Sequence, residues 1–172
     1  MKRVFGYGSL VNRRTHDFPA GVGTLSGWQR VWVSLPDRPV AILSAEPAPG
    51  QIEGLYMDVS AEAQPDLDRR EIEYDCLRLE DGSFVYSIPQ KSIVPEAKPI
   101  LRSYLDVVMQ GFETELGEAS LTRFMATTVG WNLGILDDRA TPIYPRAQVL
   151  TAEQTARYDD LLASVPVVKE LV

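Results

Sequence analysis

The stretch Phe5-Gly6-Tyr7-Gly8-Ser9-Leu10 decides how the rest of this chain is interpreted. Residues 2–8 read as a first β-strand, because their apolar members favour strands. Glycine then lets the backbone take positive φ and approach a ligand closely. Successive free N–H groups in such a turn form a small concavity that suits a carboxylate or a phosphate. Taken alone, Gly-x-Gly after a strand is usually only a turn.

The second informative stretch is Leu67-Asp68-Arg69-Arg70-Glu71-Ile72-Glu73-Tyr74, within a short helix predicted over residues 61–74. Helical spacing puts Leu67, Glu71 and Tyr74 on one face. Glu73 falls on the opposite face with Arg69, where a solvated ion pair is the natural interpretation. The same spacing leaves Glu62 and Asp68 as surface charges.

Glu71 is therefore the carboxylate predicted to face the core or a cleft. Apolar surroundings disfavour the charged form of a carboxyl, so its pKa should rise. A raised pKa makes a carboxylate a competent general base or acid near neutral pH. The simpler alternative is that Glu71 pairs with an arginine at the helix edge.

Together, Tyr7-Gly8-Ser9-Leu10 and the later set of Leu67, Asp68, Arg70, Glu71 and Tyr74 resemble the γ-glutamylcyclotransferase superfamily, which includes the ChaC and AIG2-like proteins. The resemblance implies an α+β fold, with a small closed mixed β-barrel and helices packed around it. Ile72 stands where AIG2-like sequences usually have glycine, and Val11-Asn12 stands where glutathione-specific ChaC proteins have an aromatic residue. The branch is therefore left open.

The resemblance also implies an activity. A γ-glutamyl amino acid, peptide or amine would be cyclised to 5-oxoproline, and the amine would be released by an acyltransferase or lyase type of reaction. Glu71 would be the general acid/base. The residues expected to bind the γ-glutamyl group are Tyr7, Gly8, Ser9, Leu10 and Tyr74. No cofactor and no metal is implied. The alternative is a non-catalytic small-molecule binding module on the same fold.

Composition sets wider bounds. The chain has 172 residues and fits one domain spanning 1–172, with 45% hydrophobic and 24% charged residues. A net charge of −7 argues against nucleic acid or an anionic membrane surface as the main partner. A single cysteine excludes an internal disulfide and fits a reducing cytoplasm. A single histidine excludes a multi-His metal site, and the two residues together are too few for a Cys/His metal cluster. The oligomeric state is left open.

Strand signals come first along the chain and helical signals later, which favours an α+β domain. Further strands are predicted over 27–35, 40–44 and 51–58, with a turn at 47–50, and a hairpin around Asp81-Gly82 joins strands at 75–80 and 83–88. Helices are predicted from Pro99 to Gly117, over 118–128 and from Thr151, which has capping-box spacing with Gln154.

Other chemically capable residues rank lower. Cys76 is predicted to be a buried structural thiol, His16 a surface residue, and Trp131 a core residue. Arg13 and Arg14 are most simply solvated. The pair Asp137-Asp138 is weak evidence for a cation site. For the loop Tyr144-Pro145-Arg146 the sequence does not decide whether it reaches a substrate.

Overall fold

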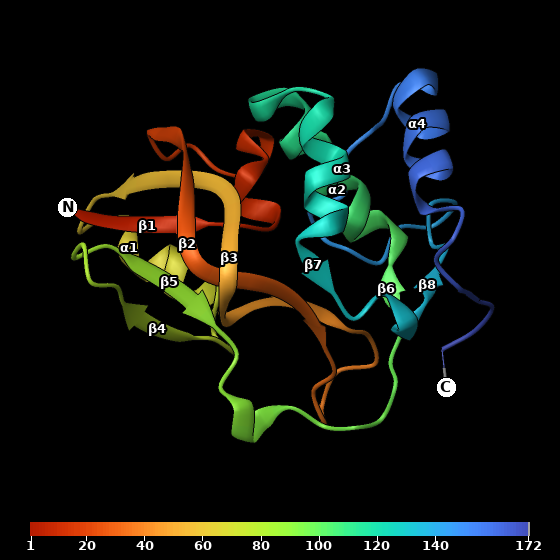
Figure 1. Ribbon diagram of the computed structural model, residues 1–172, viewed down its shortest axis with the longest axis horizontal. Coiled ribbons are helices and arrows are strands. Elements are labelled where there is room, and N and C mark those ends of the chain that lie inside the picture. Colours follow the sequence, from red (N-terminus) through yellow and green to blue (C-terminus); the bar gives the residue numbers. More distant parts are fainter. Residues whose placement is uncertain (172) are drawn as a thin grey trace.

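The computed structural model describes residues 1–171 as a six-stranded mixed sheet beside a helical half that carries a small second sheet (Figure 1). The order in the large sheet is β4-β5-β1-β3-β2-β7. Its strands are β1 (Lys2–Gly6), β2 (Ala20–Val33), β3 (Ile42–Val59), β4 (Asp75–Arg78), β5 (Phe84–Ser87) and β7 (Thr128–Val129). The β1–β5 and β2–β7 pairs are parallel and the other pairs are antiparallel.

The large sheet is open, so the α+β expectation is confirmed but the closed barrel is wrong. Closure would need β4 to pair with β7. These edge strands have only four and two residues, and every residue of β4 is exposed. Too little backbone is available at either edge to form a continuous ladder.

The β2–β3 ribbon is longer than predicted. Residues 40–44 and 51–58 were expected as separate strands with a turn at 47–50, yet β3 runs unbroken through this region. Strand β1 pairs with β3 only from Leu55 to Val59, so Pro47 and Pro49 lie where one side of β3 has no partner from β1. Proline is tolerated at such edge-like positions because no ladder bond is lost there.

The hairpin around Asp81-Gly82 is confirmed. Gly82 has φ +84°, and the Asp81 carboxylate accepts hydrogen bonds from the backbone N–H and the hydroxyl of Ser83. Both features are typical of a tight turn. Cys76 lies on exposed β4, so the predicted buried thiol is wrong. It faces outward because β4 is an edge strand with little packed on it.

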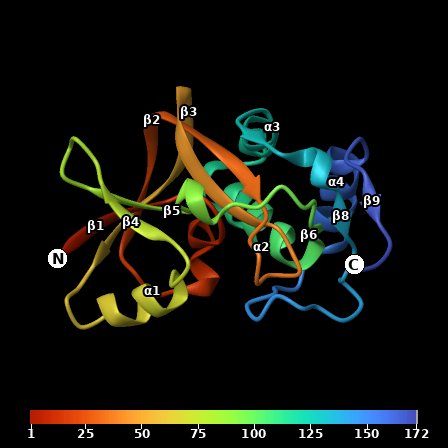
Figure 2. The ribbon, with the colours of Figure 1, turned by 90° about the horizontal axis from the view of Figure 1, so that it is seen from below.

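The helical half lies to one side of the sheet in both ribbon views (Figures 1 and 2). Its helices are α2 (Arg102–Leu116), α3 (Ala119–Ala126) and α4 (Ala152–Leu162), and its parallel sheet consists of β6 (Ile100–Leu101), β8 (Ile135–Leu136) and β9 (Val167–Val168). The capping box of Thr151 and Gln154 and the cap at Gly117 are confirmed. Helix α2 begins three residues later than Pro99, because Ile100 and Leu101 pair with β8 instead. None of the helices in residues 1–171 is both long and apolar enough to cross a membrane.

A buried arginine joins the two halves. Arg30 of β2 is fully buried, and its guanidinium donates to the Tyr7 carbonyl (2.8 Å), the Thr127 hydroxyl (2.9 Å) and the Glu53 carbonyl. The rings of Phe112 and Phe124 lie 4.7 and 5.1 Å from its carbon Cζ. Burial lowers the pKa of Arg30, and nearby Glu53 opposes that shift.

We predict that Arg30→Met lowers the free energy of unfolding by ~3 kcal/mol, because one buried and two part-buried acceptors lose their donor at roughly 1–3 kcal/mol each. The stability of Arg30→Lys should lie between those of wild type and Arg30→Met, since lysine keeps the charge but lacks the planar, forked donors of a guanidinium. The control Arg123→Gln removes a half-exposed ion pair with Glu53 and should cost less than about 1 kcal/mol. Urea unfolding measures all three, and a loss below 1 kcal/mol for Arg30→Met would contradict the prediction.

Candidate active site

The loop after β1 enters a 3₁₀ turn, η1 (Ser9–Val11), at the junction of the sheet and α2. Gly8 has φ −125°, so it does not use the positive φ expected of it. Its glycine is required by close approach instead. A methyl group there would lie 2.9 Å from the Tyr104 hydroxyl oxygen and 3.3 Å from Leu43. The expected close approach to a ligand stays a prediction, and the neighbour that crowds Gly8 in the structure is a side chain of α2, nearly a hundred residues away.

Two side chains hold this loop from outside. Arg70 donates to the Ser9 hydroxyl (3.0 Å) and the Thr15 carbonyl (3.0 Å). His16 is half-buried rather than a free surface residue. Its Nε2 lies 2.8 Å from the Leu10 carbonyl, and its Nδ1 accepts the Phe18 N–H. The ring is therefore the neutral Nε2–H tautomer, and burial lowers the pKa of His16.

Glu71 immediately follows α1 (Gln64–Arg70), which is shorter than the predicted helix over 61–74. Helical spacing nevertheless continues for one turn: the Glu71 N–H bonds the Leu67 carbonyl, and the Tyr74 N–H bonds the Glu71 carbonyl, each at 2.9 Å. This turn directs the Glu71 side chain inward, where only 12% of it is exposed.

The electrostatic setting of Glu71 combines burial with nearby cations. Burial raises the pKa of Glu71, as expected from its predicted position, while Arg70 and Arg146 oppose the rise. Arg70 Nε lies 3.4 Å from Glu71 Oε1. The Glu71 carboxylate thus faces a cavity, as one interpretation of the sequence predicted. It also contacts an arginine, as the simpler alternative predicted.

The neighbouring carboxylate Glu73 was predicted to pair with Arg69, and this is wrong. Glu73 bonds Arg38 at 2.6 Å, while Arg69 pairs with Asp66 one turn earlier. The helix ends before Glu73, so the face calculated from helical periodicity no longer applies to it.

Glu71 and the glycine loop line one small cavity of about 30 Å³. It receives residues from β1, the loop, β3, β5, α2 and the turn after α1. All five predicted binding residues line it: Tyr7, Gly8, Ser9, Leu10 and Tyr74. The structure therefore brings the predicted set together around one carboxylate.

Two of the four tyrosines that line this cavity donate their hydroxyls to backbone carbonyls. Tyr7 donates to the Tyr86 carbonyl (2.6 Å), and Tyr74 donates to the Leu43 carbonyl (2.9 Å). Burial is the main cause that raises the pKa of both, and Glu71 adds to it. Tyr74 hence lines the cavity as a neutral wall, with its hydroxyl directed to Leu43 rather than to Glu71.

A larger cleft of about 380 Å³ adjoins the small cavity and shares with it Ser9, Glu71, Tyr74 and Tyr104. Small-molecule sites commonly have volumes of roughly 300–1,000 Å³. The cleft is closed on one side by the loop containing Tyr144 and Arg146, whose tyrosine ring packs edge-on against Tyr104 at 5.0 Å between centroids. The cleft can therefore hold a small molecule, and the 30 Å³ cavity beside Glu71 adds room for only a small polar group at one end of it.

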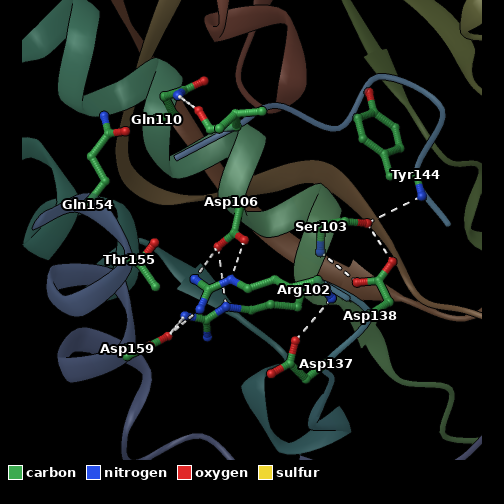
Figure 3. A network of polar contacts seen from close by, with 12 residues as sticks. Arg102, Ser103, Asp106, Gln110, Asp137, Asp138, Tyr144, Gln154, Thr155 and Asp159 are labelled. Atoms are coloured by element: carbon green, nitrogen blue, oxygen red, sulfur yellow. Dashed lines mark hydrogen bonds and ion pairs between the residues drawn. The ribbon is translucent and has the colours of Figure 1, made fainter. Parts of the chain in front are cut away.

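A buried polar network fixes that loop against α2 (Figure 3). The Asp138 carboxylate accepts the Ser103 N–H (2.7 Å), the Ser103 hydroxyl (2.6 Å) and the Ile143 N–H (2.8 Å). The Ser103 hydroxyl oxygen in turn accepts the Tyr144 N–H at 3.3 Å. Asp138, which lies 35 residues after Ser103 in the sequence, therefore caps the first turn of α2.

The same network includes two ion-paired arginines. Arg139 donates to both oxygens of Asp106 (2.6 and 2.8 Å), and Arg102 and Arg139 both contact Asp159. Among residues 1–171 no cluster of three or more His, Cys, Asp or Glu side chains is arranged to hold a metal ion.

Sequence reasoning missed Tyr104, and it assigned no role to Arg70 or Arg146. Arg70 stood in the quoted motif, so its position beside Glu71 was an available signal. Tyr104 lies inside the helix predicted from Pro99 to Gly117, where no motif singles it out. Arg146 lies 75 residues after Glu71, and no local pattern connects the two. Trp131 packs against the core beside Trp32 and Phe124, as predicted.

No family model and no curated protein matches this sequence. Solved structures do. YkqA from Bacillus subtilis aligns with a TM-score of 0.58 and 18% identity over 75% of this chain and 56% of that one, so this chain spans about half of its length. The uncharacterised protein loc79017 from Homo sapiens aligns with a TM-score of 0.56 and 13% identity, covering 90% of this chain and 96% of that one. A structure named gamma-glutamyl cyclotransferase aligns with a TM-score of 0.57 and 13% identity, covering 92% and 98%.

This chain has the γ-glutamylcyclotransferase-like fold. At 13–18% identity the likeness concerns the fold, and it extends over nearly the whole of both chains in the last two comparisons. In this γ-glutamylcyclotransferase-like fold, the cavity between the β1 loop and the turn after α1 is the candidate active site.

The crowding at Gly8 predicts a specific rescue. Gly8→Ala should destabilise the protein by ~1–3 kcal/mol, because the added methyl overlaps the Tyr104 hydroxyl. Tyr104→Phe removes that hydroxyl, so the double variant should recover part of the loss. A double-mutant cycle by denaturant unfolding measures the coupling. Purely additive losses would contradict the contact.

The half-buried His16 ring, which bonds the loop at Leu10, predicts a pH dependence of stability. Its folded pKa lies below the ordinary value of about 6.5. The unfolded state therefore binds more protons in this range. The neutral His16 ring contributes to the free energy of unfolding above about pH 6.5, and this contribution is lost as the pH falls below that value. The unfolding free energies of wild type and His16→Gln should converge on acidification from pH 7 to pH 5. Parallel curves would show that the pKa of His16 is not lowered by folding.

Proposed function

We propose that this protein is a γ-glutamylcyclotransferase-like enzyme that converts a γ-glutamyl amino acid, peptide or amine into 5-oxoproline and a free amine. The observation that carries the proposal is the position of Glu71, a buried carboxylate in one cavity with Gly8 and Ser9. The fold shared with a protein named gamma-glutamyl cyclotransferase supports it.

In the proposed reaction, the β1 loop holds the α-carboxylate of the γ-glutamyl group. Val11 and Asn12 already use their N–H groups on Gly8 and Ser9 carbonyls, at 2.9 and 3.1 Å. The donors that begin η1 have no acceptor within the turn, and the Ser9 N–H faces the Tyr104 hydroxyl, a contact that a substrate carboxylate would replace. Their position beside Glu71 holds the α-amine within reach of the carboxylate.

Glu71 then acts on the proton of the amine. The neutral α-amine nitrogen attacks the γ-carbonyl carbon, and its proton passes to Glu71. The bond between the γ-carbon and the leaving nitrogen breaks as Glu71 returns the proton to that nitrogen. The lactam formed is 5-oxoproline. General acid/base help of this kind contributes ~10²–10⁴-fold.

A non-catalytic binding module on the same fold is the alternative. The observation in its favour is the 3.4 Å contact between Arg70 and Glu71, which would also stabilise a carboxylate with only a structural role. Turnover separates the two functions, because a binder would release no 5-oxoproline from any γ-glutamyl compound.

We expect the purified protein to release 5-oxoproline from γ-glutamyl substrates, and Glu71→Gln to reduce kcat/KM by ~10²–10⁴-fold. Because the pKa of Glu71 is raised, kcat/KM should rise with pH through a value above the ordinary 4.5, as the carboxylate ionises. The residual kcat/KM of Glu71→Gln should not show this rise with pH.

The control variant Glu62→Gln removes an exposed carboxylate just before α1, outside the two hollows. It should keep the wild-type rate and pH profile. Equal rates for wild type and Glu71→Gln would refute the role of Glu71, and absence of release by a folded protein would favour the binding module.

A further inference from the structure

The cleft beyond Glu71 carries a surplus of positive charge. Three arginines and two glutamates line it: Arg38, Arg70, Arg146, Glu71 and Glu73. The protein as a whole is acidic, with a net charge of −7. A cleft with a surplus of one sign of charge attracts ligands of the opposite sign, even on a protein whose net charge repels them.

Two of the three arginines are already engaged. Arg38 is paired with Glu73 at 2.6 Å. Arg70 spreads its guanidinium over Ser9, Thr15 and Glu71. Within residues 1–171, the Arg146 guanidinium is in none of the ion pairs or hydrogen bonds, so it is the cation available to a ligand.

The backbone that carries Arg146 is held firmly. The Tyr144 N–H bonds the Ser103 hydroxyl, the Ala147 N–H bonds the Tyr144 carbonyl at 3.1 Å, and Gln148 donates its amide to the Arg146 carbonyl at 3.2 Å. Asp138 anchors the start of the same segment at Ile143. Because this backbone is already ordered, binding of an anion to Arg146 has to order only its side chain.

A second hollow also touches Arg146 and Arg70, on the side of Thr15 and His16. Three aspartates line that hollow: Asp17, Asp58 and Asp66. They disfavour an anion there. The Glu71 side is therefore the better place for an anion, because Glu73 is neutralised by Arg38 and Arg70 faces Glu71.

We propose that Arg146 binds a carboxylate on the leaving group, so that the released amine is an amino acid or peptide with a free carboxylate rather than a neutral or cationic amine. This inference rests on the proposed function. If Glu71 returns the proton to the leaving nitrogen, that nitrogen lies at Glu71, and the remainder of the leaving group extends into the cleft. Apolar residues of the same cleft, among them Ile42, Ile143 and Pro145, would surround its side chain. A guanidinium is well suited to a carboxylate because it donates two parallel hydrogen bonds.

The test compares γ-glutamyl-alanine with γ-glutamyl-alanine amide, in which a neutral carboxamide replaces the carboxylate of the leaving group. Wild type should show a kcat/KM ratio of ~10–100 in favour of the free carboxylate, as for loss of a hydrogen bond to a charged group. Arg146→Gln should bring the ratio close to one. Arg146→Lys should retain part of it. Arg14→Gln, which removes an exposed cation outside these hollows, should keep the wild-type ratio.

Binding to the Glu71→Gln protein, measured by calorimetry with the same two compounds, separates this inference from the proposed function. Turnover with a ratio near one in wild type would overturn the role of Arg146 and leave the cyclising reaction in place. Absence of turnover would overturn the reaction. In that case, tighter binding of the carboxylate compound that Arg146→Gln abolishes would still support an anion subsite, and equal or absent binding of the two would overturn it.

Discussion

The buried guanidinium of Arg30 is the interaction on which the arrangement of this molecule depends. It connects the carbonyl of Tyr7, the carbonyl of Glu53 in β3 and the hydroxyl of Thr127 after α3. A cation at the centre of a protein is costly unless its donors are satisfied and its charge is compensated. Here carbonyl dipoles and two phenylalanine rings replace water. The sheet and the helical half are thereby fixed in one relative position.

That relative position matters because the candidate site belongs to neither half alone. The glycine loop follows β1, Glu71 follows α1, and Tyr104 comes from α2. Arg30 bonds the residue that begins the loop, and Arg70 bonds Ser9 within it. The loop is thus held from the core on one side and from the turn after α1 on the other. A site assembled from several elements needs such support to keep its geometry to within a fraction of an ångström.

Features that depend on near neighbours in the chain were predictable, and features that depend on distant ones were not. The Asp81-Gly82 hairpin and the Thr151 capping box rest on residues within a few positions. The inward direction of Glu71 follows from spacing to Leu67 and Tyr74. By contrast, β3 continues through Pro47 only because of where β1 ends, and the sheet stays open only because β4 and β7 are short. Tyr104 and Arg146 reach the site through tertiary packing, which no local pattern encodes.

The electrostatics around Glu71 reflect a compromise between two demands. Burial raises its pKa by disfavouring the carboxylate, whereas a general base must be in the carboxylate form to accept a proton. Arg70 and Arg146 oppose the effect of burial. Arg70 also holds the glycine loop, so the group that moderates the carboxylate is the group that positions the loop beside it. Loop geometry and proton affinity are therefore coupled through one side chain, and changing Arg70 would alter both at once.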